Sequence, residues 1–318
     1  MQPSGRFECM RVKASIIALA LVLTGCSYEP PGPAVEQAVA APVDAARVTV
    51  EDAGKGEKRV ITYEDIDSEQ DVYFELTEGF SQDVVDAEVA TDFESSTPEE
   101  ATTGFNLNAE VSEATDDPAQ TPATRNAFMT LTSPTYTGTE ALNIESGDGF
   151  QFGWRADDAG QVSSLRLAAP QSANDDARSV LEQAIVELTS MPIVFPDEEI
   201  GEGAVWTVES RTSGDSTLLQ TTTFTLDDLT ETGAELSMDI SQRPALGALA
   251  MEDGGELEVM DTETRSTGNL SVDFSQPLPT NGDIDIATRV SYGTEESQIR
   301  VLQSTNTRMT FRPVADNS

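Results

Sequence analysis

The side chains that could do chemistry in this sequence are few in kind. The 318 residues include 57 Asp and Glu, but no histidine and only two cysteines, Cys9 and Cys26. Without histidine the chain has no Ser-His-Asp or Cys-His catalytic set and no imidazole metal ligand. The chemistry left to consider is that of the Cys26 thiol and of the many carboxylates.

The surroundings of Cys26 predict how its thiol is used. A short basic region and an apolar run, Ala14 to Leu23, precede it. This order is typical of a secretory signal peptide, and the run is much shorter than the roughly 20 residues that span a bilayer as a helix. The run ends in an apolar residue, two small residues and a cysteine, which together form the lipobox of a prokaryotic lipoprotein: Leu23, Thr24, Gly25 and Cys26.

The lipobox predicts an acylated protein. We expect residues 1–25 to be removed and Cys26 to carry diacylglycerol and a further acyl group such as palmitate. Two or more acyl chains hold a protein stably on a membrane, at about 0.8 kcal/mol per buried methylene. The expected location is therefore the extracytoplasmic side of the cell membrane. Residues 26–45, rich in Pro and Ala, are expected to form a flexible tether.

Carboxylate catalysis needs two acids close together in a cleft, as in glycoside hydrolysis. Adjacent acids such as Asp157 and Asp158 are frequent here, but neighbours on a strand point to opposite faces. The sequence has no nucleophile elbow, P-loop or dinucleotide fingerprint, and its acidic spacing fits no calcium loop. We therefore expect a protein that is not an enzyme and that uses no cofactor and no metal.

The charge also limits the partners. The formal net charge is −39, which argues against binding to nucleic acid, whose phosphates it would repel. Much of the acidity is expected in solvated loops near residues 81–103 and 112–124. Arginines on predicted strands, among them Arg155 and Arg166, are expected to pair with Asp and Glu across strands. A cluster of them that holds a lipid phosphate is the alternative.

The pattern of apolar residues predicts the elements. Apolar and polar residues alternate over many stretches, which is typical of strands with one wet face. Clear examples are Val72 to Leu76, Phe105 to Val111, Phe150 to Trp154, Leu236 to Ile240, Leu270 to Phe274 and Ile284 to Tyr292. One stretch has helical spacing instead, with Asn174 placed to cap it and Pro192 placed to end it. Its apolar positions are Ala177, Leu181, Ala184, Ile185 and Leu188.

These elements define the predicted fold. It is mainly β (α+β), with a long curved antiparallel sheet or half-open β-barrel packed on one amphipathic helix at about 174–191. Residues 46–318 are expected to form a single β-rich domain, because the only strong helix lies between the two halves of the strand pattern and neither half has a complete core of its own.

A motif after the helix resembles a known family. The segment from Pro196 to Trp206 contains Ile200-Gly201-Glu202-Gly203-Ala204-Val205-Trp206. It is similar to the Val-Gly-x-Gly-x-x-Trp segment of actinobacterial-type lipoproteins of unknown function. Their layout is similar to that of LolA/LppX-like half-barrel envelope carriers. The resemblance implies a sheet folded around one helix, with space between them for acyl chains.

Two hypotheses about function follow. The first is a non-enzymatic carrier or sensor of an amphiphilic envelope molecule, whose cavity would be lined by Trp154, Trp206, Leu181, Ile185 and Leu188. On the alternative interpretation of these side chains, they simply close a dry core. The second hypothesis is an envelope scaffold or protein-interaction module without a small-molecule ligand. The sequence identifies no protein partner for it.

Overall fold

The structure is a computed structural model. It describes residues 33–115, 121–212, 218–245, 248–250 and 256–314. All of them belong to one compact unit, Pro33–Ser318. The lipobox residues Leu23, Thr24, Gly25 and Cys26 lie outside the described residues, as does the centre of the predicted loop at 112–124.

The described residues form one α-helix, one 3₁₀ turn and sixteen strands. The helix α1 is Asp175–Thr189 and the turn η1 is Glu145–Gly147. The strands are β1 Val39–Pro42, β2 Arg47–Asp52, β3 Lys55–Arg59, β4 Glu69–Asp86, β5 Glu99–Glu113, β6 Arg125–Thr137, β7 Gln151–Ala156, β8 Val162–Ala168, β9 Ile200–Glu202, β10 Val205–Thr212, β11 Leu218–Leu229, β12 Gly233–Pro244, β13 Ala248–Ala250, β14 Glu256–Asp273, β15 Asn281–Gly293 and β16 Ile299–Pro313.

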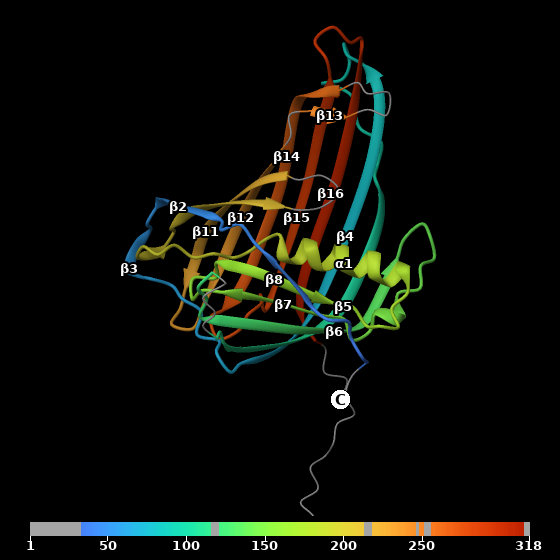
Figure 1. The fold of residues 1–318 in the computed structure, drawn as a ribbon. Helices are drawn as coiled ribbons and strands as arrows, with labels where there is room; N and C mark the ends of the chain where they lie inside the picture. The colour runs from blue at the N-terminus through green and yellow to red at the C-terminus, as the bar shows by residue number, and fades with distance from the viewer. Residues whose placement is uncertain (1–32, 116–120, 213–217, 246–247, 251–255, 315–318) are drawn as a thin grey trace, which may run out of the picture. The chain divides into compact units, whose positions relative to one another are not determined.

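Fourteen of these strands form one antiparallel sheet. Its order is β1-β8-β7-β6-β5-β4-β16-β15-β14-β12-β11-β10-β2, with β13 paired to β14 beside this path, and β3 pairs with β9 separately. The sheet does not close into a barrel, because β1 and β2 remain as its two edges. Figure 1 shows the strand direction turning between the steep β14–β16 and the nearly level β5–β8, with α1 beside this turn. The expectation of a mainly β fold with one helix is confirmed.

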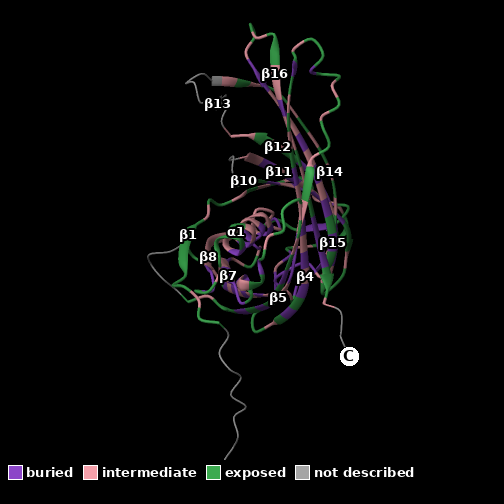
Figure 2. Cartoon of the chain, turned by 90° about the vertical axis from the view of Figure 1, so that its right-hand side faces the viewer, coloured by how far each residue is buried: buried purple, intermediate pink, exposed green. Residues whose placement is uncertain are grey.

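The strands form where the sequence alternates. In β12, Leu236, Met238 and Ile240 are buried while Glu235, Asp239 and Ser241 are exposed. Alternate side chains of a strand point to opposite faces, so one face of the sheet is dry and the other is wet. The dry faces of distant strands join one core cluster with the helix, and Figure 2 shows this buried material gathered around α1.

The helix is fixed at its start and along one face. The Asn174 side chain accepts a hydrogen bond from the Ala177 N–H at 2.8 Å, and Asp175 and Asp176 follow in the first turn. A capping oxygen and early acids satisfy and complement the free N–H groups of a helix start. The buried face consists of the five apolar residues that the spacing predicts: Ala177, Leu181, Ala184, Ile185 and Leu188.

Some strands continue past the core. On β4, Phe74 and Leu76 are buried, but the same face continues to Phe80 and Val84, which are 53% and 62% exposed. On the opposite face Val85 packs with Leu302 in a small second cluster. The acidic loop predicted near 81–103 is therefore shorter than expected: β4 extends to Asp86 and β5 begins at Glu99. Asp83, Asp86, Glu99 and Glu100 lie on strands, whereas Glu88, Asp92 and Glu94 lie in the connection, so acidic composition did not locate the loop boundaries.

The N-terminal part of the unit reaches both edges of the sheet. Strand β1 pairs with β8 at one edge, and β2 pairs with β10 at the other. Only residues 43–46 separate β1 from β2. The expected tether at 26–45 thus differs from the structure in its second part, since Val39–Pro42 forms ladder hydrogen bonds and Glu36 pairs with Arg178 at 2.7 Å. Unpaired strand edges attract such pairing, which overrides the Pro/Ala composition.

Candidate functional site

A cavity lies where the end of α1 meets the sheet. Its volume is about 70 Å³. Its wall is mainly apolar, with Leu188, Met191 and Ile193 from the helix end and the segment after it. The sheet and the loop after β14 supply the other apolar side chains: Trp154, Val162, Leu165, Leu270, Pro277, Leu278, Pro279, Ile284, Met309 and Phe311.

The wall of the cavity also shows how strongly the sheet bends. Leu165 on β8 and Leu270 on β14 both line it, although β7, β6, β5, β4, β16 and β15 lie between those strands in the sheet. Strands that far apart in a flat sheet could not border one small cavity, because neighbouring strands are about 4.8 Å apart. The sheet is therefore curved around the helix end.

The polar side of the cavity is formed by Tyr63 and Arg125. The Arg125 guanidinium donates through Nε to Asp65 Oδ1 at 2.7 Å and through Nη2 to Asp65 Oδ2. Arg125 is 2% exposed and Asp65 is 0% exposed. A bidentate pair of this kind satisfies both buried charges at once. The cavity therefore borders a compensated ion pair rather than a free charge.

Tyr63 completes this group. Its ring lies under the Arg125 guanidinium, with 4.1 Å between Cζ and the ring centroid. Burial raises the pKa of Tyr63 to about 12, although the Arg125 charge opposes this rise. The phenol is neutral at physiological pH, so Tyr63 offers an aromatic face and a hydroxyl, and no negative charge, to the cavity.

Two of the five predicted lining residues border the cavity, Trp154 and Leu188. The other three lie in the surrounding core. Trp206 is fully buried, stacks on Phe224 with 5.3 Å between ring centroids, and donates from Nε1 to the Val194 carbonyl at 2.9 Å. Leu181 and Ile185 are buried members of the same core cluster. The ligand-binding role assigned to the set stays a prediction.

The sequence interpretation missed Tyr63, Asp65 and Arg125. Arg125 and Asp65 are 60 residues apart in the chain, and Asp65 lies in the connection before β4. No local pattern links them. The only available signal was the position of Arg125 at the start of a strand. Asn126 and Ala127 continue an alternation of wet and dry positions that places Arg125 on the dry face. Such an arginine lies at a dry position and needs a partner.

A second group that the sequence interpretation missed lies between α1 and β4. The Gln183 Nε2 atom contacts Glu187 Oε1 at 3.2 Å and Glu78 Oε1 at 3.4 Å. Burial, and then the charge of Glu78, raise the pKa of Glu187 to about 7. A carboxyl with such a pKa can exchange a proton near neutral pH. The two acids are far apart in sequence, so adjacent acidic pairs were the wrong place to look.

The described residues hold no group of three or more His, Cys, Asp and Glu side chains arranged to bind a metal ion. Within the same ranges no helix is long and apolar enough to cross a membrane.

Comparisons with protein families and with curated sequences identify no relative. No protein-family model matches the chain, and no curated protein sequence matches it either.

Proposed function

We propose that this protein is a membrane-anchored extracytoplasmic lipoprotein that binds an amphiphilic ligand and is not an enzyme. The anchor is the acylated thiol of Cys26, released by cleavage after Gly25. The single observation that carries ligand binding is the apolar cavity between the end of α1 and the curved sheet. An apolar void with a few convergent polar groups is the usual form of a small-molecule site.

The arrangement of the sheet around α1 supports this proposal, because it is the arrangement that the resemblance to half-barrel carriers implies. A half-open barrel of the LolA/LppX-like kind needs a sheet that bends around a helix and leaves its edges apart. Here the fourteen-stranded sheet carries α1 against its dry face and keeps β1 and β2 as separate edges. An amphiphile would place its chain along Leu188 and Met309 and its polar end beside Tyr63 and Arg125.

The size of the cavity sets a condition on binding. About 70 Å³ is well below the roughly 300–1,000 Å³ of ordinary ligand sites. An acyl chain therefore enters only if the end of α1 moves away from the sheet. The helix is attached there by its apolar face and the short segment that follows it, and such packing separates at lower cost than a strand ladder.

The test begins with the protein purified from membranes. Organic extracts analysed by mass spectrometry should contain a lipid in stoichiometric amount. A fluorescent fatty acid, 11-(dansylamino)undecanoic acid, should bind with a blue shift in emission. Leu188→Phe fills the cavity and should weaken this binding about tenfold, whereas Leu188→Met conserves volume and serves as the matched control.

Opposite results would reject the proposal. Extracts without lipid, together with equal probe binding by the Leu188→Phe and Leu188→Met variants, would leave the envelope scaffold as the better hypothesis. The anchor is tested separately, because Cys26→Ser should abolish incorporation of labelled palmitate and leave the apolar cavity unchanged.

A further inference from the structure

Two arginines on neighbouring strands occupy the same face of the sheet. In the β7–β8 ladder Gly153 is opposite Arg166, and Arg155 is opposite Ser164. The pair between these two, Trp154 opposite Leu165, lines the apolar cavity. Because side chains alternate along a strand, Arg155 and Arg166 point away from the core to the outer face.

The position of Arg166 is closely defined. Its guanidinium lies over Phe128, with 5.4 Å between Cζ and the ring centroid. Its side chain crosses Gly153, where an added Cβ would lie 3.1 Å from Arg166 Nε. The same Cβ would lie closer still to the Ala127 carbonyl oxygen, so the glycine leaves room first for the β6 backbone and next for this arginine. Arg155 is held differently, by a hydrogen bond from Nη2 to the Thr115 carbonyl at 3.0 Å.

Neither arginine has a carboxylate partner among the described residues, contrary to the cross-strand pairing expected from the sequence. The ion pairs found there use Arg47, Arg125, Arg178, Arg265 and Arg308. The Nε atoms of Arg155 and Arg166 are both buried, and neither has a hydrogen-bond partner in the part of the chain that the structure describes. Burial, and then the charge of Arg155, lower the pKa of Arg166.

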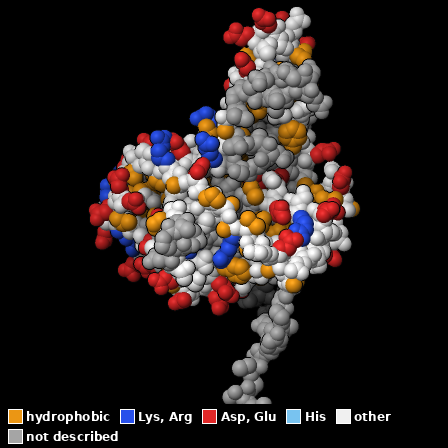
Figure 3. Space-filling model, viewed as in Figure 1, with side chains coloured by type: hydrophobic (Ala, Val, Ile, Leu, Met, Phe, Trp, Pro, Cys, Tyr) orange, Lys and Arg blue, Asp and Glu red, His pale blue; other side chains and the backbone are white. Residues whose placement is uncertain are grey.

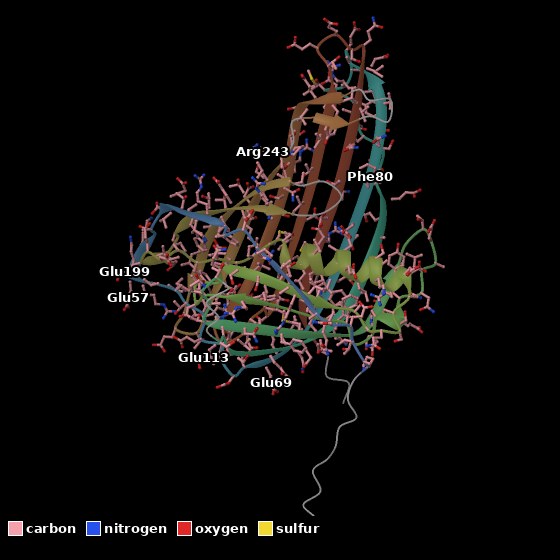
Figure 4. All side chains as sticks on the ribbon, viewed as in Figure 1. Glu57, Glu69, Phe80, Glu113, Glu199 and Arg243 are labelled. Atoms are coloured by element: carbon pink, nitrogen blue, oxygen red, sulfur yellow. The ribbon has the colours of Figure 1, made fainter. Side chains whose placement is uncertain are left out.

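This arrangement is unusual for so acidic a chain. The net charge is −39, and Figure 3 shows carboxylates spread over the visible face. Glu113 (labelled in Figure 4) lines a surface pocket together with both arginines, but forms no ion pair with either of them within the described ranges. Two partly desolvated cations side by side repel each other, and an anion from outside the chain would remove that cost.

A pocket of about 350 Å³ lies at the two arginines. Besides them it is lined by Ala40, Ser112, Glu113, Thr115, Asn126, Trp154 and Ser164. Apart from Trp154 it shares no residue with the apolar cavity. We propose that this outer pocket binds a phosphate group, either as free phosphate or as the headgroup of a lipid.

The chemistry favours phosphate over a carboxylate. A guanidinium presents its N–H groups as a planar fork that matches two oxygens of a phosphate or carboxylate. Two forks offer more donors than one carboxylate accepts, and a phosphate monoester with nearly two negative charges balances both cations. The hydroxyl of Ser164 and the amide of Asn126 add neutral donors at the wall.

The first experiment is isothermal titration of the purified full chain with inorganic phosphate at constant ionic strength, set with sodium chloride. We expect saturable binding. Arg155→Gln combined with Arg166→Gln should weaken it by about tenfold or more, because charge-assisted hydrogen bonds are lost. Arg47→Gln changes an exposed arginine far from the pocket and should leave phosphate affinity unchanged.

A second variant keeps the test decisive if the double substitution disturbs folding. Glu113→Gln removes the one carboxylate among the described residues that line the pocket and should strengthen phosphate binding several-fold. No saturable binding by the unmodified chain, or equal affinity in the double variant and in the Arg47→Gln control, would overturn the proposal. So would an unchanged affinity in Glu113→Gln.

The source of the phosphate is decided by a second probe. Dihexanoyl phosphatidate, a soluble short-chain lipid, carries the same group on an apolar body. Affinity more than about tenfold above that of inorganic phosphate would identify a lipid headgroup, since its methylenes add burial. Equal affinity would identify free phosphate. Because the pocket shares only Trp154 with the apolar cavity, its failure would not affect the proposed amphiphile site.

Discussion

Two arginines on nearby strands, Arg125 on β6 and Arg166 on β8, have opposite surroundings. Both lie over an aromatic ring, Tyr63 and Phe128 respectively. Arg125 is nearly inaccessible to solvent and donates two hydrogen bonds to the Asp65 carboxylate. Arg166 is only partly buried, and its Nε has no hydrogen-bond partner among the described residues. One site is complete within the described residues, and the other is the one where we propose an anion from outside the chain.

The comparison distinguishes an arginine that stabilises the fold from an arginine that we propose binds a ligand. A buried arginine with its own carboxylate specifies how segments of the chain meet, here the segment before β4 with the start of β6. An arginine kept near another cation does not stabilise the fold, so its position is better explained by a ligand. The same side chain thus has a structural role on the dry face and a recognition role on the wet face.

The largest expected effect is at the complete site. Arg125→Met leaves Asp65 buried without a partner and should lower the free energy of unfolding by about 3–5 kcal/mol. Arg166→Met, the matched change at the incomplete site, should alter it by about 1 kcal/mol or less. Urea denaturation followed by tryptophan fluorescence measures both. Similar losses in the two variants would refute the distinction between the sites.

Removing both members of the Arg125–Asp65 pair should recover most of the lost free energy of unfolding. The double variant Arg125→Met with Asp65→Leu has no unpaired buried charge and should unfold within about 1–2 kcal/mol of the unmodified chain. The same denaturation experiment checks it. A double variant as unstable as Arg125→Met alone would mean that packing against Tyr63, rather than charge compensation, determines stability there.

Glu187 avoids a buried negative charge in a third way, because its carboxyl group keeps its proton up to a higher pH. Its pKa of about 7 in the folded protein lies above its ordinary value of 4.5. The folded state therefore holds a proton that the unfolded state releases, and stability should fall as pH rises from about 4.5 through 7. Glu187→Gln should remove this slope and raise the unfolding free energy above pH 8 by on the order of 2–3 kcal/mol.

Thermal unfolding between pH 4 and pH 9 measures this effect and contains its own control. At pH 4 the variant and the unmodified chain should be equally stable, because the carboxyl is protonated in both states. A constant difference between them at every pH would show that the substitution acts through packing and not through the proton.

The smallest expected effect is at the incomplete site without phosphate. Arg155→Gln with Arg166→Gln should change the free energy of unfolding by less than about 1 kcal/mol and could raise it, since a repulsion disappears. Addition of phosphate should then stabilise the unmodified chain and not the variant. A large loss of stability without phosphate would assign these arginines a structural role like that of Arg125.

Much of the fold was predictable because it depends on local periodicity. The helix with its cap at Asn174 and its buried face ending at Leu188 follows from spacing alone, and so do strands such as Leu236–Ile240. Composition was a poorer guide. It predicted a tether where Val39–Pro42 pairs with β8, and a long loop where β4 continues to Asp86. In both places a neighbouring strand decides the conformation.

The sites were less predictable than the fold. Trp154 and Leu188 were identified because apolar periodicity marks dry positions, but the sequence does not say which dry positions border a void. The polar groups beside the cavity, Tyr63, Asp65 and Arg125, were missed entirely. Arg125 meets Asp65, and Glu187 approaches Glu78, across separations that only the folded sheet brings together. Within the described residues the expected pairing of Arg166 with a carboxylate is not found, because opposite charge in the sequence does not ensure contact in space.

The double use of residues 39–52 has a consequence for how the protein responds to proteolysis. This one short stretch covers the outermost ladder positions at both ends of the large sheet, β8 through β1 and β10 through β2. A protease cut just after Asp52 would therefore uncover two strand edges in a single event. Exposed edges are templates for pairing with other chains. The intact chain ends its sheet in the short strands β1 and β2, of 4 and 6 residues, whereas a trimmed chain would present the longer β8 and β10, of 7 and 8 residues. Short edge strands are one way in which proteins limit pairing with other chains, so the N-terminal stretch reduces the edge that is open to such pairing.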